Sequence, residues 1–236
     1  MAVYKIFPEK DAFISSHDPA QNTGRDEVLE ISNTNAINLN TSAQGDVPAV
    51  KRTLIQFKTT DINDVITNKI GNAAFSSSLN LYLANATVAP LDYTLEAYPV
   101  SGAWDMGTGR VSDIPKTTDG CSWGWRGASG SNAWTSAGGD YYTNKSGSSQ
   151  DFLYTSNKDI SMDVTNMVKL WNSSSIDNHG FIVKLTGSIE LSDSYVETAY
   201  FSVDTHTIYP PALEFKWDDS IYSSSLPPVT GSDFIL

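Results

Sequence analysis

The chain has 236 residues, a net charge of −12 and a single cysteine. The acidic balance argues against direct binding of nucleic acid or an anionic membrane, because contacts to phosphates need clustered lysine and arginine, and one cysteine excludes an intrachain disulfide. No run approaches the ~18 apolar residues of a membrane span. The opening MAVYKIFPEKDAF lacks the apolar core of a signal peptide, so we expect synthesis in a cytoplasm without export by the usual route.

Short runs of alternating apolar residues recur between turn-forming clusters, in a chain rich in Asn, Ser, Thr, Gly and Asp. Residues two apart in sequence share one face of a strand, so each such run predicts a strand. In chain order, we expect strands at 4–7, 12–15, 28–32, 52–58, 79–85, 93–100, 181–187, 196–203 and 212–217. One apolar face and one mixed face in each strand is typical of antiparallel sheets packed in pairs.

Two stretches have a helical period instead. Residues 163–174 begin with Asp163, a good N-cap, and the spacing i, i+3, i+4, i+7 is met by Val164, Met167, Val168 and Trp171. Residues 61–71 are a weaker candidate of one to two turns. Short helices among many strands predict an all-β fold, an antiparallel jelly-roll-like β-sandwich with one or two short helices in its connections.

Two regions break the alternation. Residues 33–50 are polar and predict a long loop, and residues 219–236 follow the last strand without periodicity. We therefore divide the chain into a β-sandwich domain at 1–218 and an extended C-terminal arm at 219–236. Either the arm is a frayed terminus, or it docks on a neighbouring subunit by strand addition or by insertion into a pocket. The candidate contact residues of such an arm are Pro227, Pro228, Phe234, Ile235 and Leu236.

Three of the six tryptophans lie in one glycine-rich stretch, residues 120–142, which also carries Tyr141 and Tyr142. Such a stretch is either a ligand platform, for example a sugar-binding surface with flat apolar rings, or a loop that folds back to fill a core. Glycine fits the second interpretation, because it leaves room where the backbone passes beneath a ring.

Few residues have the pattern of a reactive or metal-binding site. No nucleophile motif surrounds Cys121, which we interpret as a small, inert residue. The histidines lack the spacing of a zinc site. Asp11, Asp18 and Asp26 lie near Asn22 and offer oxygen ligands for Ca²⁺, but no loop of EF-hand form is present. We predict no bound metal, no cofactor and no enzymatic activity; a polysaccharide depolymerase would need a suitably placed pair of carboxylates, which the sequence neither shows nor forbids.

The order of seven segments resembles the DNRLRE domain family. These segments are DAFISS…QNTG…LEI, KRTLIQF, LNLYL, AYPVSGAW, GCSW…WTSAGGDY, DVTNMVKLW…NHGFIVKL and AYFS…PPALEFKW. The likeness covers roughly residues 9–217 and rests on order and spacing, since no segment is specific alone. It implies a jelly-roll-like β-sandwich of the kind found in secreted, carbohydrate-associated proteins and in viral proteins. The opening MAVYKIFPEKDA, together with the ending of the chain, also looks like structural proteins of tailed-phage virions.

The resemblance implies structural roles for several residues. Trp123 and Trp134 match the two tryptophan positions of the family, so we expect them to pin the loop, and Trp104 is expected to be a packing residue. Trp125 falls outside the family pattern and is the candidate for an exposed ring. Arg52 stands at the family's arginine position, where it is expected to pair with a buried carboxylate or to cap loop carbonyls.

Two functions follow as expectations. The first is a non-enzymatic structural component of a bacteriophage virion, in capsid decoration, neck or tail attachment, which contacts other virion proteins and forms a homo-oligomer in the particle. The alternative is a carbohydrate-binding module that recognises host surface glycans, with Trp125, Tyr141 and Tyr142 as a stacking platform. Neither involves nucleic acid or a membrane.

Overall fold

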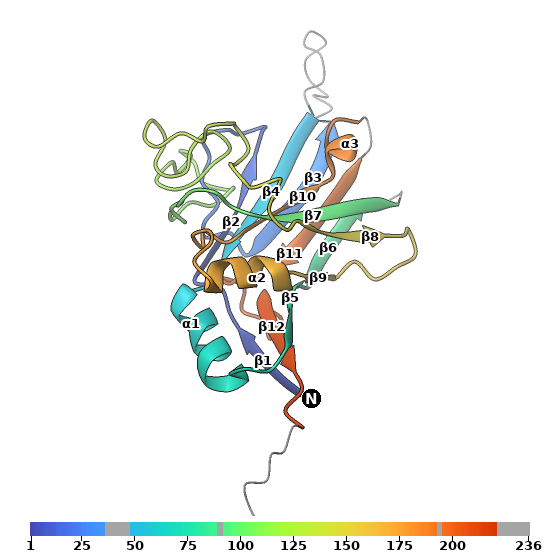
Figure 1. Ribbon diagram of the computed structural model, residues 1–236. Helices are drawn as coiled ribbons and strands as arrows, with labels where there is room; N and C mark the ends of the chain where they lie inside the picture. The colour runs from blue at the N-terminus through green and yellow to red at the C-terminus, as the bar shows by residue number, and fades with distance from the viewer. Residues whose placement is uncertain (36–47, 89–91, 193–194, 221–236) are drawn as a thin grey trace, which may run out of the picture.

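The computed structural model describes residues 1–35, 48–88, 92–192 and 195–220, and its strands form two antiparallel sheets (Figure 1). The small sheet has the strand order β1 (Ala2–Ile6), β12 (Ala212–Trp217), β5 (Phe75–Leu81) and β9 (Ile160–Asp163). The large, curled sheet has the order β6 (Leu83–Val88), β11 (Val196–Phe201), β3 (Val28–Asn35), β4 (Pro48–Gln56), β10 (Phe181–Leu185), β7 (Tyr93–Pro99) and β8 (Ser148–Phe152). A further strand, β2 (Lys10–Ser15), pairs with β4. The predicted all-β sandwich is confirmed.

Both helical stretches predicted from the sequence are present. The first is α1 (Thr59–Asp64), which continues as a π-helix, η1 (Val65–Ile70), and the second is α2 (Thr165–Asn172). The predicted N-cap, Asp163, is wrong by one residue, because Val164 is the N-cap of α2 and carries no capping side chain. The Asp163 carboxylate nevertheless accepts the backbone N–H of Thr165, the first helical residue, at 2.9 Å. A four-residue helix, α3 (Gly187–Glu190), was not predicted, because so short an element has no measurable period.

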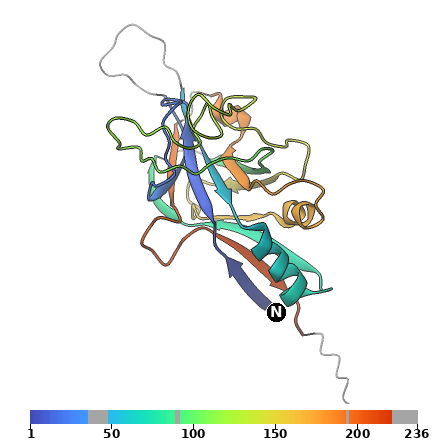
Figure 2. The ribbon, with the colours of Figure 1, turned by 90° about the vertical axis from the view of Figure 1, so that its left-hand side faces the viewer.

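The main core lies between the two sheets and is closed at one side by the helices (Figures 1 and 2). The apolar stripe of α2 faces it, and the Trp171 ring lies 4.6 Å from the Phe181 ring, centre to centre. Phe57 meets the same phenylalanine edge-on at 6.2 Å. This core therefore joins α2 to the large sheet through three aromatic residues.

A second, smaller core lies on the outer face of the large sheet. It is covered by residues 100–147, which connect β7 to β8 and which we call the long connection (Figure 2). Its buried members are Ala12, Ile14, Leu54, Val100, Trp104, Cys121, Trp134 and Ile182.

The two cores explain a departure from the predicted strand pattern. The sequence predicts one apolar and one mixed face for each strand, yet Leu54 and Ile182 are buried in the second core while Ile55 and Phe181 are buried in the main core. β4 and β10 are thus buried on both faces, because the long connection covers the side that would otherwise meet water.

Two strands were not predicted at all, and the single strand predicted at 79–85 is divided between β5 of the small sheet and β6 of the large sheet. β8 has the sequence SSQDF, which has little apolar content, and β9 has only four residues, ISMD. Both are held by backbone pairing with neighbours far away in sequence, β7 and β5 respectively. The long loop predicted at 33–50 is shorter, since β3 runs to Asn35 and β4 begins at Pro48.

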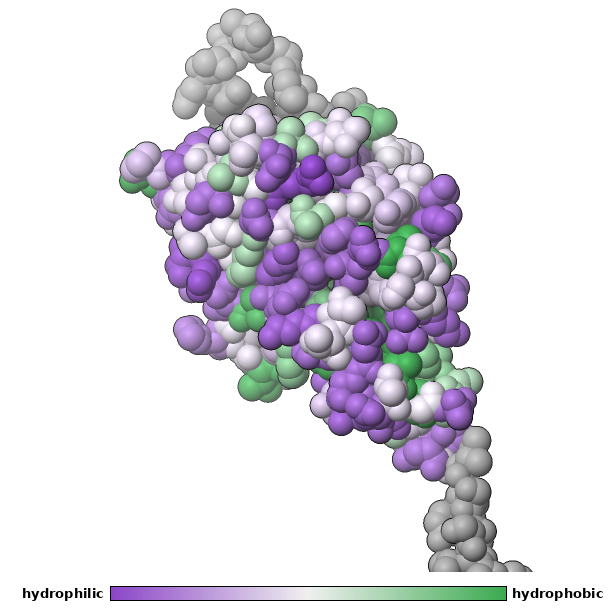
Figure 3. All heavy atoms as spheres, turned by 60° about the vertical axis from the view of Figure 1, so that its left-hand side comes forward, coloured by the Kyte–Doolittle hydropathy of each residue, from purple (hydrophilic) through white to green (hydrophobic). Residues whose placement is uncertain are grey.

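One face of the molecule is mostly hydrophilic, with small and separate hydrophobic spots (Figure 3). None of the helices in the described part of the chain has the length and apolar content that crossing a membrane requires.

Candidate functional site

The tryptophans of the long connection fill the second core. Trp104 and Trp134 are only 2% and 5% exposed, and their indole N–H groups donate to the backbone carbonyls of His179 and Ser122, each at 2.9 Å. Trp123 is half-buried against the same core. The expectation that Trp104 packs and that Trp134 pins the loop is therefore confirmed, and Trp123 takes part in the same packing.

Asn22 ties the long connection to the loop after β2. Its buried side-chain amide donates to the carbonyls of Met106 and Cys121, both at 2.8 Å. Its side-chain oxygen accepts the backbone N–H groups of Gly24 and Gly109. One side chain thus satisfies four backbone groups, three in the long connection and one in its own loop, where no sheet ladder can do so. The sequence analysis considered Asn22 only as a neighbour of acidic residues and missed this role.

Arg52 anchors the other end of the long connection. Its guanidinium donates to both carboxylate oxygens of Glu190, at 2.9 and 2.7 Å, and to the carbonyl of Gly138 at 2.7 Å. Glu190 is buried, so the expected pairing with a buried carboxylate is confirmed, and so is the expected capping of a loop carbonyl. Gly138 has a φ of 93°, and an added Cβ would lie 2.8 Å from both Trp123 and Arg52. Glycine is therefore required here.

A chain of charges continues beneath Arg52. The Lys184 ammonium lies 3.4 Å from Glu190 and 3.6 Å from Glu96, and the lysine is almost fully buried in β10. Above it, the Arg52 guanidinium lies 5.0 Å from the Trp123 ring centre and 6.0 Å from that of Tyr141. The two cations and two carboxylates neutralise one another, so this cluster holds α3, β4, β7 and β10 to the long connection.

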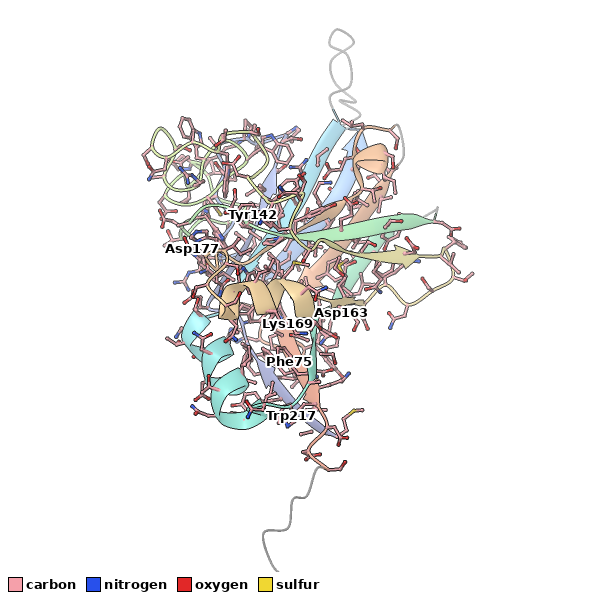
Figure 4. All side chains as sticks on the ribbon, in the orientation of Figure 1. Phe75, Tyr142, Asp163, Lys169, Asp177 and Trp217 are labelled. Atoms are coloured by element: carbon pink, nitrogen blue, oxygen red, sulfur yellow. The ribbon has the colours of Figure 1, made fainter. Side chains whose placement is uncertain are left out.

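The three aromatic residues expected to form a platform take different positions. Tyr141 packs against the second core and stacks on Tyr98, with ring centres 5.3 Å apart. The neighbouring Tyr142 packs against the main core, and Figure 4 places it above α2. Trp125 is half-buried and pairs through its backbone with Ala133. No ring contact among the described residues joins Trp125 to either tyrosine.

An open hollow of about 430 Å³ lies beside Tyr141. Hydroxyl-bearing side chains dominate its lining, which consists of Ser101, Thr135, Ser136, Gly139, Asp140, Tyr141 and Thr143. Burial raises the pKa of the Tyr141 phenol, so its hydroxyl stays protonated at neutral pH and can donate a hydrogen bond. Of the expected platform residues, only Tyr141 lines this hollow.

The acidic residues considered for Ca²⁺ have other partners. Asp18 pairs with Lys116 and His17, and the side chain of Asp11 accepts the backbone N–H of Val203 at 2.8 Å. In the described ranges, no group of three or more His, Cys, Asp or Glu side chains is placed to hold a metal ion. Burial raises the pKa of the Cys121 thiol to about 12, so the thiolate is scarce at neutral pH and the inert role expected for Cys121 agrees with its environment.

The free edge of the small sheet presents apolar side chains to solvent. β1 pairs with β12 along one edge, and no strand of the described residues pairs with its other edge. Val3 is 51% exposed, Tyr4 39%, and Phe7, which follows the strand, 54%. Figure 1 shows that β1 and β12 project from the body of the molecule beside the N-terminus. We call Val3, Tyr4 and Phe7, with the unpaired backbone of β1, the open edge.

Two hollows lie at the end of the small sheet where β12 stops, and Trp217 lines both. Their volumes are about 390 and 280 Å³, and Phe75 lines the smaller one. Figure 4 shows Phe75 and Trp217 below α2, and the Lys169 ammonium lies 5.6 Å from the Phe75 ring centre. The described chain ends nearby, since Asp219 pairs with the Met1 amino group at 2.9 Å. The candidate arm contacts Pro227, Pro228, Phe234, Ile235 and Leu236 lie outside the described residues.

No family model matches the chain, and no curated protein matches it. The likeness to DNRLRE domains and to tailed-phage virion proteins stays a prediction from the sequence.

Proposed function

We propose that the protein is a non-enzymatic structural component of a tailed-bacteriophage virion that assembles through its open edge. The observation that carries this proposal is the edge strand β1, which leaves backbone hydrogen-bonding groups unpaired beside exposed Val3, Tyr4 and Phe7. The likeness of the opening residues MAVYKIFPEKDA to virion proteins supports it.

The physical reason is that an exposed edge strand is a template for another chain. Natural proteins protect such edges with charge, proline or covering loops unless the edge has a partner. The charge on β1 gives little protection, because the Lys5 ammonium is paired with Glu214 at 3.2 Å. A partner strand would gain main-chain hydrogen bonds from β1 and apolar contacts from its side chains. Residues 219–236 of a neighbouring copy are our proposed partner, and repeated weak contacts of this kind add up in a symmetric particle.

The first test is the incorporation of edge variants into phage particles. Val3→Lys places a charge on the open edge, and we expect its occupancy in purified particles to fall strongly. Val111→Lys is the matched control, because Val111 is 52% exposed but lies in the long connection, far from the sheet edge in sequence. Equal occupancy of both variants at the wild-type level would refute the proposal.

The second test addresses the arm. Deleting residues 219–236 should abolish incorporation if the arm supplies the partner strand, whereas normal occupancy of the truncated protein would show that this part of the proposal is wrong. The copy number relative to the major capsid protein then locates the protein: a comparable number indicates decoration, and the number of a single small ring indicates the neck or tail.

A further inference from the structure

The hollow beside Tyr141 has the chemistry of a binding site for an uncharged sugar. Four residues with aliphatic hydroxyls, Ser101, Thr135, Ser136 and Thr143, line it together with Tyr141. Each aliphatic hydroxyl can donate one hydrogen bond and accept two, which is the pattern that a sugar ring presents in return. We infer that this hollow binds a neutral hexose unit of a surface polysaccharide, with Tyr141 as its aromatic contact.

The lining also argues against other ligand classes. The only charged side chain in it is Asp140, so an anion would be repelled. A metal ion would find one carboxylate, and both oxygens of that carboxylate already accept hydrogen bonds from the backbone, at 2.7 Å from Thr135 and 2.9 Å from Ser136. An apolar ligand would bury hydroxyls without partners, which is unfavourable. A neutral polyol can both donate to and accept from such hydroxyls.

The hollow is already ordered before any ligand binds. The two hydrogen bonds that the Asp140 carboxylate accepts fix the backbone of Thr135 and Ser136. At the floor, Gly139 has a φ of 98°, and an added Cβ would lie 3.0 Å from the side chain of Ile182. The ring of Tyr141 is held by its stacking on Tyr98. The protein therefore loses little conformational entropy on binding. This favours the binding of ligands that make few contacts, such as single sugars.

This inference does not depend on the assembly role, because the long connection and the open edge are separate parts of the fold (Figure 1). It also differs from the expected platform of Trp125, Tyr141 and Tyr142, since it excludes Trp125 and Tyr142 and adds four hydroxyl residues. If the edge variants are incorporated into particles normally, the assembly proposal is wrong but the inference of a sugar site still stands.

The experiment uses the full chain on an array of bacterial surface oligosaccharides, followed by calorimetric titration of the oligosaccharide that is retained best. The double variant Thr135→Val/Thr143→Val removes two exposed hydroxyls without touching the core, and we expect it to weaken binding by about tenfold or more. Tyr141→Ala should weaken binding to a similar extent or further. Thr118→Val is the matched control, because Thr118 is also exposed in the long connection but outside the hollow.

The outcomes separate clearly. Retention of neutral oligosaccharides that is weakened by both hollow variants and unchanged in Thr118→Val and Trp125→Ala supports the inference. Retention of no oligosaccharide, retention of acidic ones alone, or binding that is lost in Trp125→Ala but unchanged in Thr135→Val/Thr143→Val would overturn it. Circular dichroism of each variant checks that the fold is intact, and the double valine variant decides the matter if Tyr141→Ala does not fold.

Discussion

The long connection and the small sheet differ in how they satisfy their backbone polar groups and in which apolar side chains they bury. The long connection has hardly any regular structure, yet it buries Trp104 and Trp134 and is tied down by Asn22 and Arg52. The small sheet is regular, yet it leaves Val3 and Tyr4 exposed on β1.

The difference follows from how each backbone satisfies its polar groups. Within a sheet, the ladder pairs the N–H and C=O groups, and the outward backbone groups and side chains of an edge strand are free to contact other molecules. An irregular segment has no ladder, so side chains must bond its backbone and fill the space beneath it. The long connection therefore depends on individual side chains, whereas β1 does not.

The strongest test of this dependence is a pair of tryptophan substitutions within the long connection. Trp134→Ala should lower the free energy of unfolding by about 3–5 kcal/mol, because it opens a cavity in the second core. Trp125→Ala, at a half-buried position in the same stretch, should have a clearly smaller effect. Urea denaturation measures both, and equal losses would mean that the second core is not what holds the long connection.

A somewhat smaller loss is expected for Arg52→Ala. The substitution leaves Glu190 buried with only Lys184 nearby, which should lower the free energy of unfolding by about 3 kcal/mol. Limited proteolysis should then cut the long connection faster than it cuts the rest of the chain. Arg52→Lys keeps the charge but loses the planar guanidinium that bonds Glu190 and Gly138 at once. We therefore expect a loss of stability between those of the wild type and Arg52→Ala. A variant as resistant to proteolysis as the wild type would contradict the anchoring role.

A buried carboxylate between β2 and the connection from β11 to β12 should make stability depend on pH. Asp11 of β2 contacts the turn that leads towards β12, and burial raises the pKa of its carboxyl from 3.8 to about 7. The folded state then binds more protons than the unfolded state between these values, so stability falls as pH rises through this window. We expect the free energy of unfolding to be about 2 kcal/mol higher at pH 5 than at pH 8.

The control for that titration is Asp11→Asn, which retains an acceptor for the N–H of Val203 and cannot ionise. Its thermal midpoint should vary much less between these two pH values. If the variant and the wild type show the same pH profile, the titrating group lies elsewhere. Asp26 is the next candidate, since burial raises the pKa of its carboxyl to about 6.

The smallest effect on stability is expected at the open edge. Val3→Lys replaces an exposed side chain on a strand that keeps its pairing with β12, so the free energy of unfolding should change by less than about 0.5 kcal/mol. The same variant is expected to fail in particle incorporation. A large loss of stability would show that Val3 supports the fold rather than a partner.

Sequence alone determined the elements that carry their own signal. Alternation located most strands, and the spacing of Val164, Met167, Val168 and Trp171 located α2. Both patterns are local, because strand and helix geometry repeat every few residues. Composition is also local, and it indicated that residues 120–142 form either a ligand platform or a loop that fills a core.

Only the tertiary structure decided which alternative holds at each residue. It placed Trp134 in a core and left Trp125 outside it, and it turned Tyr141 and Tyr142 towards different cores. It also joined Asn22 to Cys121 and Arg52 to Glu190, pairs separated by 99 and 138 positions. No local pattern reports such contacts, because they depend on which distant segments the fold brings together. The hollow beside Tyr141 likewise could not be predicted from sequence. Serine and threonine are common residues, and only the folded backbone brings these ones together.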